Sequence, residues 1–201
     1  MTTRILLVGV LAAVIAGCGT LARPPAVNII KLQLLGEDAR IQTIEPVGAS
    51  IAVAEPTALP GFLSARFAYL EEGLALRYYG KHEWTASPAR LLQPALVRAL
   101  DQSGGFDSVT APPSIALADL RLDVQLTRLV HDFRQSEGGE IVLEVRAQLT
   151  SLQDRRVLAT RSFEYREPAQ AHPVAGAEAA DRALARLLED VVAFAAENAN
   201  R

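Results

Sequence analysis

The stretch LRLDVQLTRLVHDFRQSEGGEIVLEVRAQLT, residues 120–150, decides the fold. Apolar and polar residues alternate over residues 120–127, and the same alternation returns over residues 141–150. Successive side chains of a β-strand point to opposite faces, so each segment predicts a strand with one buried and one exposed face. The intervening RQSEGGE predicts a turn, and the two segments are therefore expected to pair as an antiparallel hairpin.

A third strand and a helix complete the C-terminal half. Residues 157–165 follow the short segment LQDRR and again favour a strand, so three strands on short turns predict a meander. One face of this meander is apolar and must be covered. Residues 177–196 carry an apolar stripe at helical spacing, which predicts an amphipathic helix over that face.

The N-terminal half predicts shorter strands. Two are expected at residues 28–35 and 50–54. The segment RFAYLEEGLALRYY indicates a hairpin, with strands over residues 66–70 and 74–79 and Gly73 at the turn.

A further helix is predicted between these strands and the meander. Residues 87–100, SPARLLQPALVRAL, repeat leucines at helical spacing, and Ser87 can cap the free amides. Pro94 conflicts with this helix and should either bend it or mark its effective start. The predicted fold class is therefore α+β, an antiparallel sheet including a three-stranded C-terminal meander, with two main helices packed on one face. We expect residues 27–201 to form a single domain.

The start of the chain indicates a lipid anchor. Residues 1–17 contain a short polar head with one positive charge and then thirteen uncharged, mostly apolar residues. This is the layout of a secretory signal peptide, and the apolar run is too short to span a membrane. Its end, Ile15-Ala16-Gly17-Cys18, resembles the lipobox of bacterial lipoproteins.

This resemblance implies that Cys18 becomes the first residue and carries a diacylglycerol and an N-acyl chain. A thiolate is a far better nucleophile than a hydroxyl, and two or three chains hold a protein stably on a membrane. Residues 18–26, which include Pro24 and Pro25, then predict a lipidated flexible tether. The alternative is a buried or free cysteine in an uncleaved leader, which the position and flanks of Cys18 disfavour.

Length and charge limit what the remaining chain can be. Of the 201 residues, 184 follow the predicted leader, enough for one domain with a substantial core and marginal for two. The formal net charge is −3, and loss of Arg4 with the leader makes it one unit more negative. No long basic run remains, so charge argues against nucleic acid as a partner.

No constellation of residues indicates an enzyme. His82, His131 and His172 are far apart in the sequence and lack metal-ligand spacing, so no metal site is predicted and each is expected at the surface or in a loop. The segment GASIA, residues 48–52, lacks the strand-turn-helix context of a serine nucleophile. The glycine pair at 138–139 lies in a predicted hairpin rather than at a helix start, so no cofactor-binding loop is expected.

The segment LRYYGKHEWTASPARLL gathers Tyr78, Tyr79 and Trp84, the only tryptophan. Aromatic anchors are enriched at protein interfaces, so these three residues are candidates for contacting a partner. The alternative is that Trp84 and one tyrosine seal the core between the hairpin and the helix, which is the commoner use of such residues. Both interpretations can hold at once.

The chain resembles the ABC-type transport auxiliary lipoprotein family, the PqiC-like lipoproteins of MCE-type intermembrane lipid transport systems. The features that carry this resemblance are the lipobox, the strand IIKLQLL, the block IAVAEPTALPGFLSARFAYLEEGLALRYYGKHEWTASPARLLQPALVRAL, and the closing meander with its helix. The similarity covers the whole chain after the leader, and its most specific part is the order of ALPGFL, the hairpin, the aromatic segment and the proline-started helix.

The resemblance implies a part in lipid traffic between two membranes, in a system of an ATPase, a permease and an MCE-domain protein that bridges the periplasm. This chain would be its non-catalytic dock, anchored at the periplasmic face of the outer membrane of a Gram-negative bacterium. A homo-oligomeric ring around the tip of the bridge is one arrangement that the resemblance allows. In enteric-type sorting, an aspartate directly after the acylated cysteine retains lipoproteins at the inner membrane. This chain has Gly19 at that position.

Two other functions stay open at this point. One is an outer-membrane assembly or structural lipoprotein that serves another envelope machine, and the other is a periplasmic lipid hydrolase. For a docking protein, the uncovered face or an exposed strand edge of the sheet would pair with a partner strand or another copy.

Overall fold

The computed structural model describes residues 28–112, 118–135 and 138–200. The predicted signal peptide, tether and lipidated Cys18 lie outside the described residues. Within the described part, two α-helices, one short 3-10 helix and nine strands of one sheet follow each other in this order: β1 Ile30–Leu32, β2 Ile51–Val53, β3 Thr57–Ala58, η1 Pro60–Phe62, β4 Arg66–Leu70, β5 Arg77–Trp84, α2 Pro88–Gln102, β6 Val109–Thr110, β7 Leu120–Asp132, β8 Glu140–Ser151, β9 Arg156–Pro168 and α3 Pro173–Asn198.

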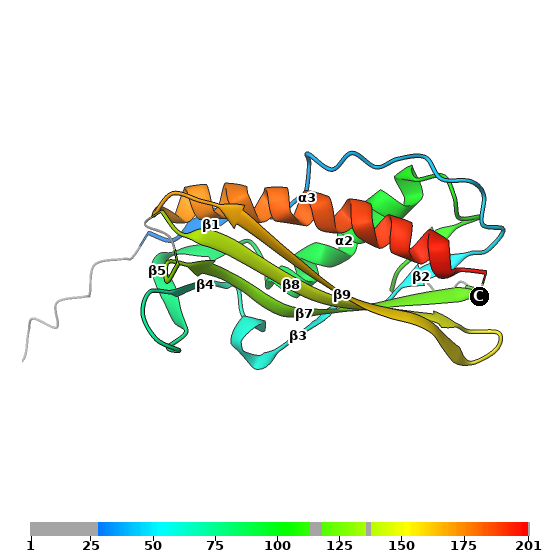
Figure 1. Ribbon diagram of the computed structural model, residues 1–201, viewed down its shortest axis with the longest axis horizontal. Coiled ribbons are helices and arrows are strands. Elements are labelled where there is room, and N and C mark those ends of the chain that lie inside the picture. The colour runs from blue at the N-terminus through cyan, green and yellow to red at the C-terminus, as the bar shows by residue number, and fades with distance from the viewer. Residues whose placement is uncertain (1–27, 113–117, 136–137, 201) are drawn as a thin grey trace, which may run out of the picture.

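The long strand β7 is paired along both of its edges. On one side it pairs antiparallel with β8 over nearly its whole length. On the other side it pairs in parallel with β2, then β3, then β4. Residues 51–70 therefore run along β7 as one interrupted strand, broken by η1 (Figure 1).

The sheet extends outward from β7 in both directions. Strand β9 pairs antiparallel with β8, while β5 pairs antiparallel with β4 and in parallel with β1. The predicted α+β class and the three-stranded meander are confirmed. The expectation of an antiparallel sheet is wrong for the N-terminal half, because an alternating pattern shows which side chains face the core but not which strand lies beside it.

Two strands of the N-terminal half also differ from the prediction in their bounds. The second hairpin strand, expected at 74–79, is β5 and continues to Trp84. The first strand, expected at 28–35, is reduced to the three residues of β1. Both differences reflect the pairing of β1 with the end of β5, which runs from Ile30↔His82 to Leu32↔Trp84. A contact between segments so far apart in the chain leaves no local signal in the sequence.

The two helices begin and end close to their predicted positions. Helix α2 continues through Pro94, so this residue does not mark the start of the helix. Ser87 occupies the N-cap position, but its side chain makes no capping hydrogen bond. At the start of α3, His172 takes that position, and its Nδ1 accepts a hydrogen bond from the Val174 amide.

Both helices and one face of the sheet share a single core. Helix α3 runs along β8 and β9 in Figure 1. The buried side chains of α2 and α3 belong to the same cluster as the inward apolar residues of the meander. Tyr165 on β9 also donates a hydrogen bond of 2.5 Å to the Asp190 carboxylate on α3, which ties the helix to the edge of the sheet.

The chain passes very close to α3 just after β1. The amides of Leu35 and Gly36 both donate to one carboxylate oxygen of Asp181, at 2.6 and 2.7 Å. Gly36 has a φ of 61°, and a Cβ atom at this position would lie 2.7 Å from a methyl carbon of Leu188. Both the backbone conformation and the close approach require glycine here.

We predict that Gly36→Ala destabilises the domain by about 1–3 kcal/mol more than Gly48→Ala. Gly48 is the matched control, because its φ of 70° carries the same backbone cost while nothing lies within 4 Å of a Cβ at that position. Urea unfolding of the two variants measures the difference. Equal losses of stability would show that α3 does not pack tightly against this segment.

Candidate interaction surface

Trp84, one of the predicted interface residues, lies in the core. Its side chain is 1% exposed, and its ring lies 4.7 Å from the ring of Phe67, centroid to centroid. It ends β5 and pairs with Leu32 of β1. Trp84 therefore seals the core, as the alternative interpretation expects, and offers no surface to a partner in this structure.

Tyr79 lies on the helix side of the sheet and is half-buried. Its hydroxyl lies 3.1 Å from Nδ1 of His131, and its ring packs 5.1 Å from that of Phe67. Burial, with smaller contributions from Tyr69 and Glu71, raises the pKa of Tyr79 to about 12. The phenol therefore stays protonated and acts as a hydrogen-bonding group of the core.

His131 is fully buried, which contradicts the expectation that each histidine lies at the surface or in a loop. A bulge in β7 between Leu126 and Arg128 shifts the alternation by one residue. Leu129 and His131 therefore face the core instead of Arg128 and Val130. An unbroken alternation predicts the opposite assignment, so the error follows from the bulge.

The environment of His131 disfavours its charged form. Gly176 of α3 lies so close that a Cβ there would be 2.6 Å from Nδ1 of His131. Among the described residues, Nε2 of His131 has no hydrogen-bond partner. Burial lowers the pKa of His131 to about 4, against an opposing effect of the Asp132 carboxylate.

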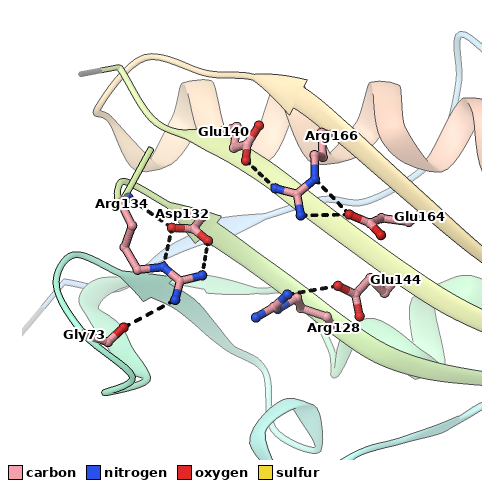
Figure 2. A network of polar contacts seen from close by, with 8 residues as sticks. All are labelled: Gly73, Arg128, Asp132, Arg134, Glu140, Glu144, Glu164 and Arg166. Carbon is pink, nitrogen blue, oxygen red and sulfur yellow. Dashed lines mark hydrogen bonds and ion pairs between the residues drawn. The ribbon is translucent and has the colours of Figure 1, made fainter. Parts of the chain in front are cut away.

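The face of the sheet opposite the helices carries a separate set of side chains, and we call it the open face. Its apolar members are few and form their own small cluster, Ala68, Leu70, Val130 and Val142. Its charged members come from β7, β8 and β9, and Figure 2 shows them in front of the strands with α3 behind. This face of the sheet is therefore largely polar, in contrast to the helix face.

Asp132 and Arg134 form the most buried ion pair of the open face. Asp132 accepts three hydrogen bonds from Arg134, two from the guanidinium at 2.6 and 2.9 Å and one from the backbone amide at 3.0 Å. The same guanidinium donates to the carbonyl of Gly73 at 3.3 Å (Figure 2). The Arg134 hydrogen bonds hold the pKa of Asp132 below its usual value. The pair thereby ties the β4–β5 turn to the end of β7.

Further ion pairs lie on the open face, between strands and within β9. Arg128 on β7 contacts Glu144 on β8 at 2.9 Å. Arg166 on β9 contacts both Glu140, at 2.5 Å, and Glu164, at 2.8 Å. Such partly exposed pairs each contribute little to stability, so their main effect is a surface of balanced, alternating charge.

An apolar groove lies beside these charges. It has a volume of about 430 Å³. Leu70 and Val130 line it together with Phe62, Leu74 and Leu76 from η1 and the β4–β5 turn, and the charged side chains that line it are Arg128, Arg134 and Glu144. Leu74 is 93% exposed and Leu63, just after η1, is 62% exposed. The open face therefore combines a concave apolar site with exposed leucines and a charged rim.

Tyr78, the remaining predicted interface residue, lies on this same face. It packs against the apolar cluster, its hydroxyl donates to the carbonyl of Gly61 at 3.0 Å, and the Arg66 guanidinium stacks 3.8 Å from its ring centre. Leu74 was expected to begin a strand over residues 74–79, but it lies in the β4–β5 turn, because β5 begins only at Arg77. The apolar residues within this turn are the signal that could have marked the groove.

Neither a metal-holding cluster nor a membrane-spanning helix is found among the described residues. In residues 28–112, 118–135 and 138–200, no group of three or more His, Cys, Asp or Glu side chains is placed to hold a metal ion. None of the described helices is long and apolar enough to cross a membrane. The strongly exposed Leu74 distinguishes the groove of the open face, of about 430 Å³, from a larger pocket of about 490 Å³ beside β1 and the start of α3.

Comparison with known proteins identifies a family and a fold. The family described as "ABC-type transport auxiliary lipoprotein component" matches residues 33–192. No curated protein matches the chain. Protein XCC0632 from Xanthomonas campestris, of the family DUF330, has a similar structure, with a TM-score of 0.77 and 22% identity over 85% of this chain and 97% of that chain.

Two other solved structures are more distant. An uncharacterized protein has a TM-score of 0.57 and 16% identity over 78% of this chain and 94% of that chain. A PelC dodecamer from Paraburkholderia phytofirmans has a TM-score of 0.45 and 15% identity over 74% of this chain and 89% of that chain. At these identities the likeness concerns the fold alone.

We predict that buried His131 makes stability depend on pH. Its pKa of about 4 in the folded chain lies below its ordinary value near 6.5, so the unfolded chain binds the proton first as pH falls. Above about pH 6.5 this difference in proton binding costs the folded state no stability. As pH falls from about 6.5 to 4, the free energy of unfolding decreases, and the decrease reaches about 2 kcal/mol at pH 5. Urea unfolding of wild type and His131→Gln at pH 7.5 and 5 measures this difference.

The matched control for this prediction is His82→Gln, which removes a partly exposed imidazole. This variant should keep the pH dependence of wild type, whereas His131→Gln should lose it. If wild type and His131→Gln respond equally to pH, then His131 is not held neutral in the folded protein.

Proposed function

The chain belongs to the family of ABC-type transport auxiliary lipoprotein components, and on that premise we propose that it is a non-catalytic, lipid-anchored dock of an intermembrane lipid transport system. It acts at the periplasmic face of the outer membrane of a Gram-negative bacterium. Its partners are an ABC ATPase, a permease and the MCE-domain protein that bridges the periplasm.

The proposal depends on a lipid anchor at Cys18. The lipobox-like sequence Ile15-Ala16-Gly17-Cys18 and the short apolar leader support acylation at this thiol. Two or three acyl chains give stable attachment, where one chain gives only reversible binding. Gly19, in place of an aspartate, supports delivery to the outer membrane.

The observation that carries the docking role is the groove of the open face. Exposed apolar side chains that gather around a concave site are typical of protein interaction surfaces. Leu74, which is 93% exposed, can bury most of its area only against another molecule. The charges of Arg128, Glu144 and Arg134 at the rim can orient a partner while the groove binds its apolar side chains. We assign this surface to the MCE-domain partner.

We propose no reaction for this chain. Of its three histidines, His131 is buried, while His82 and His172 lie 6.2 Å apart, ring centre to ring centre. Membership of a family of auxiliary transport components also supports a role without catalysis. We therefore propose binding, rather than hydrolysis, as the action of this chain.

We predict that a photo-crosslinking amino acid at position 74 captures the MCE-domain protein in intact cells. Full-length protein with the same crosslinker at position 157 is the control, because Val157 is also apolar and 51% exposed but lies on β9, away from the groove. In parallel, Leu74→Glu should reduce co-purification of the partner about tenfold or more, since burial of a leucine contributes roughly 1.5–3 kcal/mol. Val157→Glu should leave co-purification unchanged.

The outcomes separate the candidate functions. Capture of an MCE or ABC component at position 74, lost in a Cys18→Ala variant, supports anchored docking. Capture of a different envelope complex would favour the assembly or structural lipoprotein. Equal capture from positions 74 and 157 would overturn the assignment of the groove to the partner. The ring of subunits stays a prediction, which the size of the crosslinked products also tests.

A further inference from the structure

A second exposed apolar patch lies at the end of the molecule where the described chain begins. Ile29 is 42% exposed, Ile30 is 48% exposed and Val174, at the start of α3, is 38% exposed. These three residues define the patch, which we call the entry patch. It is separate from the groove of the open face and involves β1, β5 and the start of α3 (Figure 1).

Contacts between neighbouring elements hold the entry patch together. Ile30 pairs with His82 on β5. The ring of His82 lies 6.2 Å from that of His172, which caps α3 two residues before Val174. Ile29 directly precedes β1, so Ile29 and Ile30 both lie at the beginning of this edge strand. The patch borders a pocket of about 490 Å³, whose lining includes Lys31 and Val174.

The charges beside the patch are unusual for this chain. Of its 20 Lys and Arg residues, only Lys31 and Lys81 are lysines. Lys31 lies in β1 directly after Ile30, where its partly exposed ammonium pairs with Glu83 at 2.9 Å, and Lys81 lies in β5 directly before His82. A lysine has a long apolar stem and a compact, strongly hydrated head, which suits a position between an apolar layer and phosphate groups.

The position of the patch along the chain points to its occupant. Residue 28 is the first described residue, and only nine residues separate it from Cys18. At about 3.3 Å for each extended residue, these positions span at most about 30 Å, so an acylated Cys18 keeps the patch close to the bilayer.

We propose that the entry patch rests on the phospholipid surface, with Ile29, Ile30 and Val174 below the level of the phosphates and Lys31 and Lys81 among them. This inference rests on the proposed anchoring through Cys18. It adds a second membrane contact, made by the folded domain itself, and it sets the orientation of the domain. The turn between β8 and β9 lies at the opposite end of the molecule and points away from the bilayer (Figure 1).

The chemistry of the chain allows a direct test. Cys18 is the only cysteine, so once it is acylated an introduced cysteine is the only free thiol. Full-length acylated protein is reconstituted into vesicles of phosphatidylethanolamine and phosphatidylglycerol, with a spin label at Ile30→Cys or Val174→Cys. Leu152→Cys in the β8–β9 turn is the control, since Leu152 is similarly exposed, at 41%. Relaxation by oxygen, which concentrates in lipid, is compared with relaxation by an aqueous nickel chelate.

We expect the ratio of oxygen to nickel relaxation to be several-fold higher at positions 30 and 174 than at position 152. Replacing both lysines, Lys31→Gln with Lys81→Gln, should move the label at position 174 toward water. The replacement Arg146→Gln on the exposed part of β8 should leave this label unchanged. Circular dichroism of each variant checks that the fold is kept.

Vesicle flotation separates the two levels of the proposal. If the protein floats with vesicles but the labels at positions 30 and 174 are as accessible to nickel as the label at 152, the entry patch does not contact lipid and the inference is overturned, while anchoring stands. If the protein does not float, the anchor fails and the inference falls with it. Labels that become buried only on contact with other copies of the chain would assign the patch to self-association and also overturn the inference.

Discussion

The structure depends on hydrogen bonding along both edges of β7. A strand paired on one edge only would leave a row of unsatisfied amides and carbonyls beside the core. Here β8 satisfies one edge, and the interrupted strand of residues 51–70 satisfies the other. Because that second partner is parallel, the chain must cross over between the two, and α2 lies in this crossover. The placement of α2 thus follows from the pairing of β7.

The same strand also separates the helix face of the sheet from the open face. Its bulge between Leu126 and Arg128 turns His131 toward the helices and Arg128 toward the open face. One face therefore closes into a core that holds Trp84, while the other keeps charges and an apolar groove. The entry patch lies outside both, at the free edge of β1. On the two proposals made above, one small domain contacts a membrane and a protein partner at separate places.

The sequence predicts those parts of the fold that depend on local patterns. The meander and the helix over residues 173–198 follow from alternation and helical spacing, and the structure places them within a few residues of the prediction. The parallel partners of β7 and the extension of β5 to Trp84 were missed, because both depend on contacts between distant segments. For the site, Tyr78 lies on the open face and its contact with a partner stays a prediction, whereas Leu74 was expected in a strand and so gave no signal of the groove. Acylation of Cys18 stays a prediction from the lipobox.

The measurement that tests the central role of β7 most directly is native-state hydrogen exchange of the full chain in increasing urea. Amides in the middle of β7, such as those of Val124 and Leu129, should exchange only by global unfolding, with the same free energy as urea unfolding. Amides of the edge strands β1 and β9 should open at lower free energy. If the β7 amides exchange through a local opening of lower free energy while α3 stays protected, the fold does not depend on the pairing of β7.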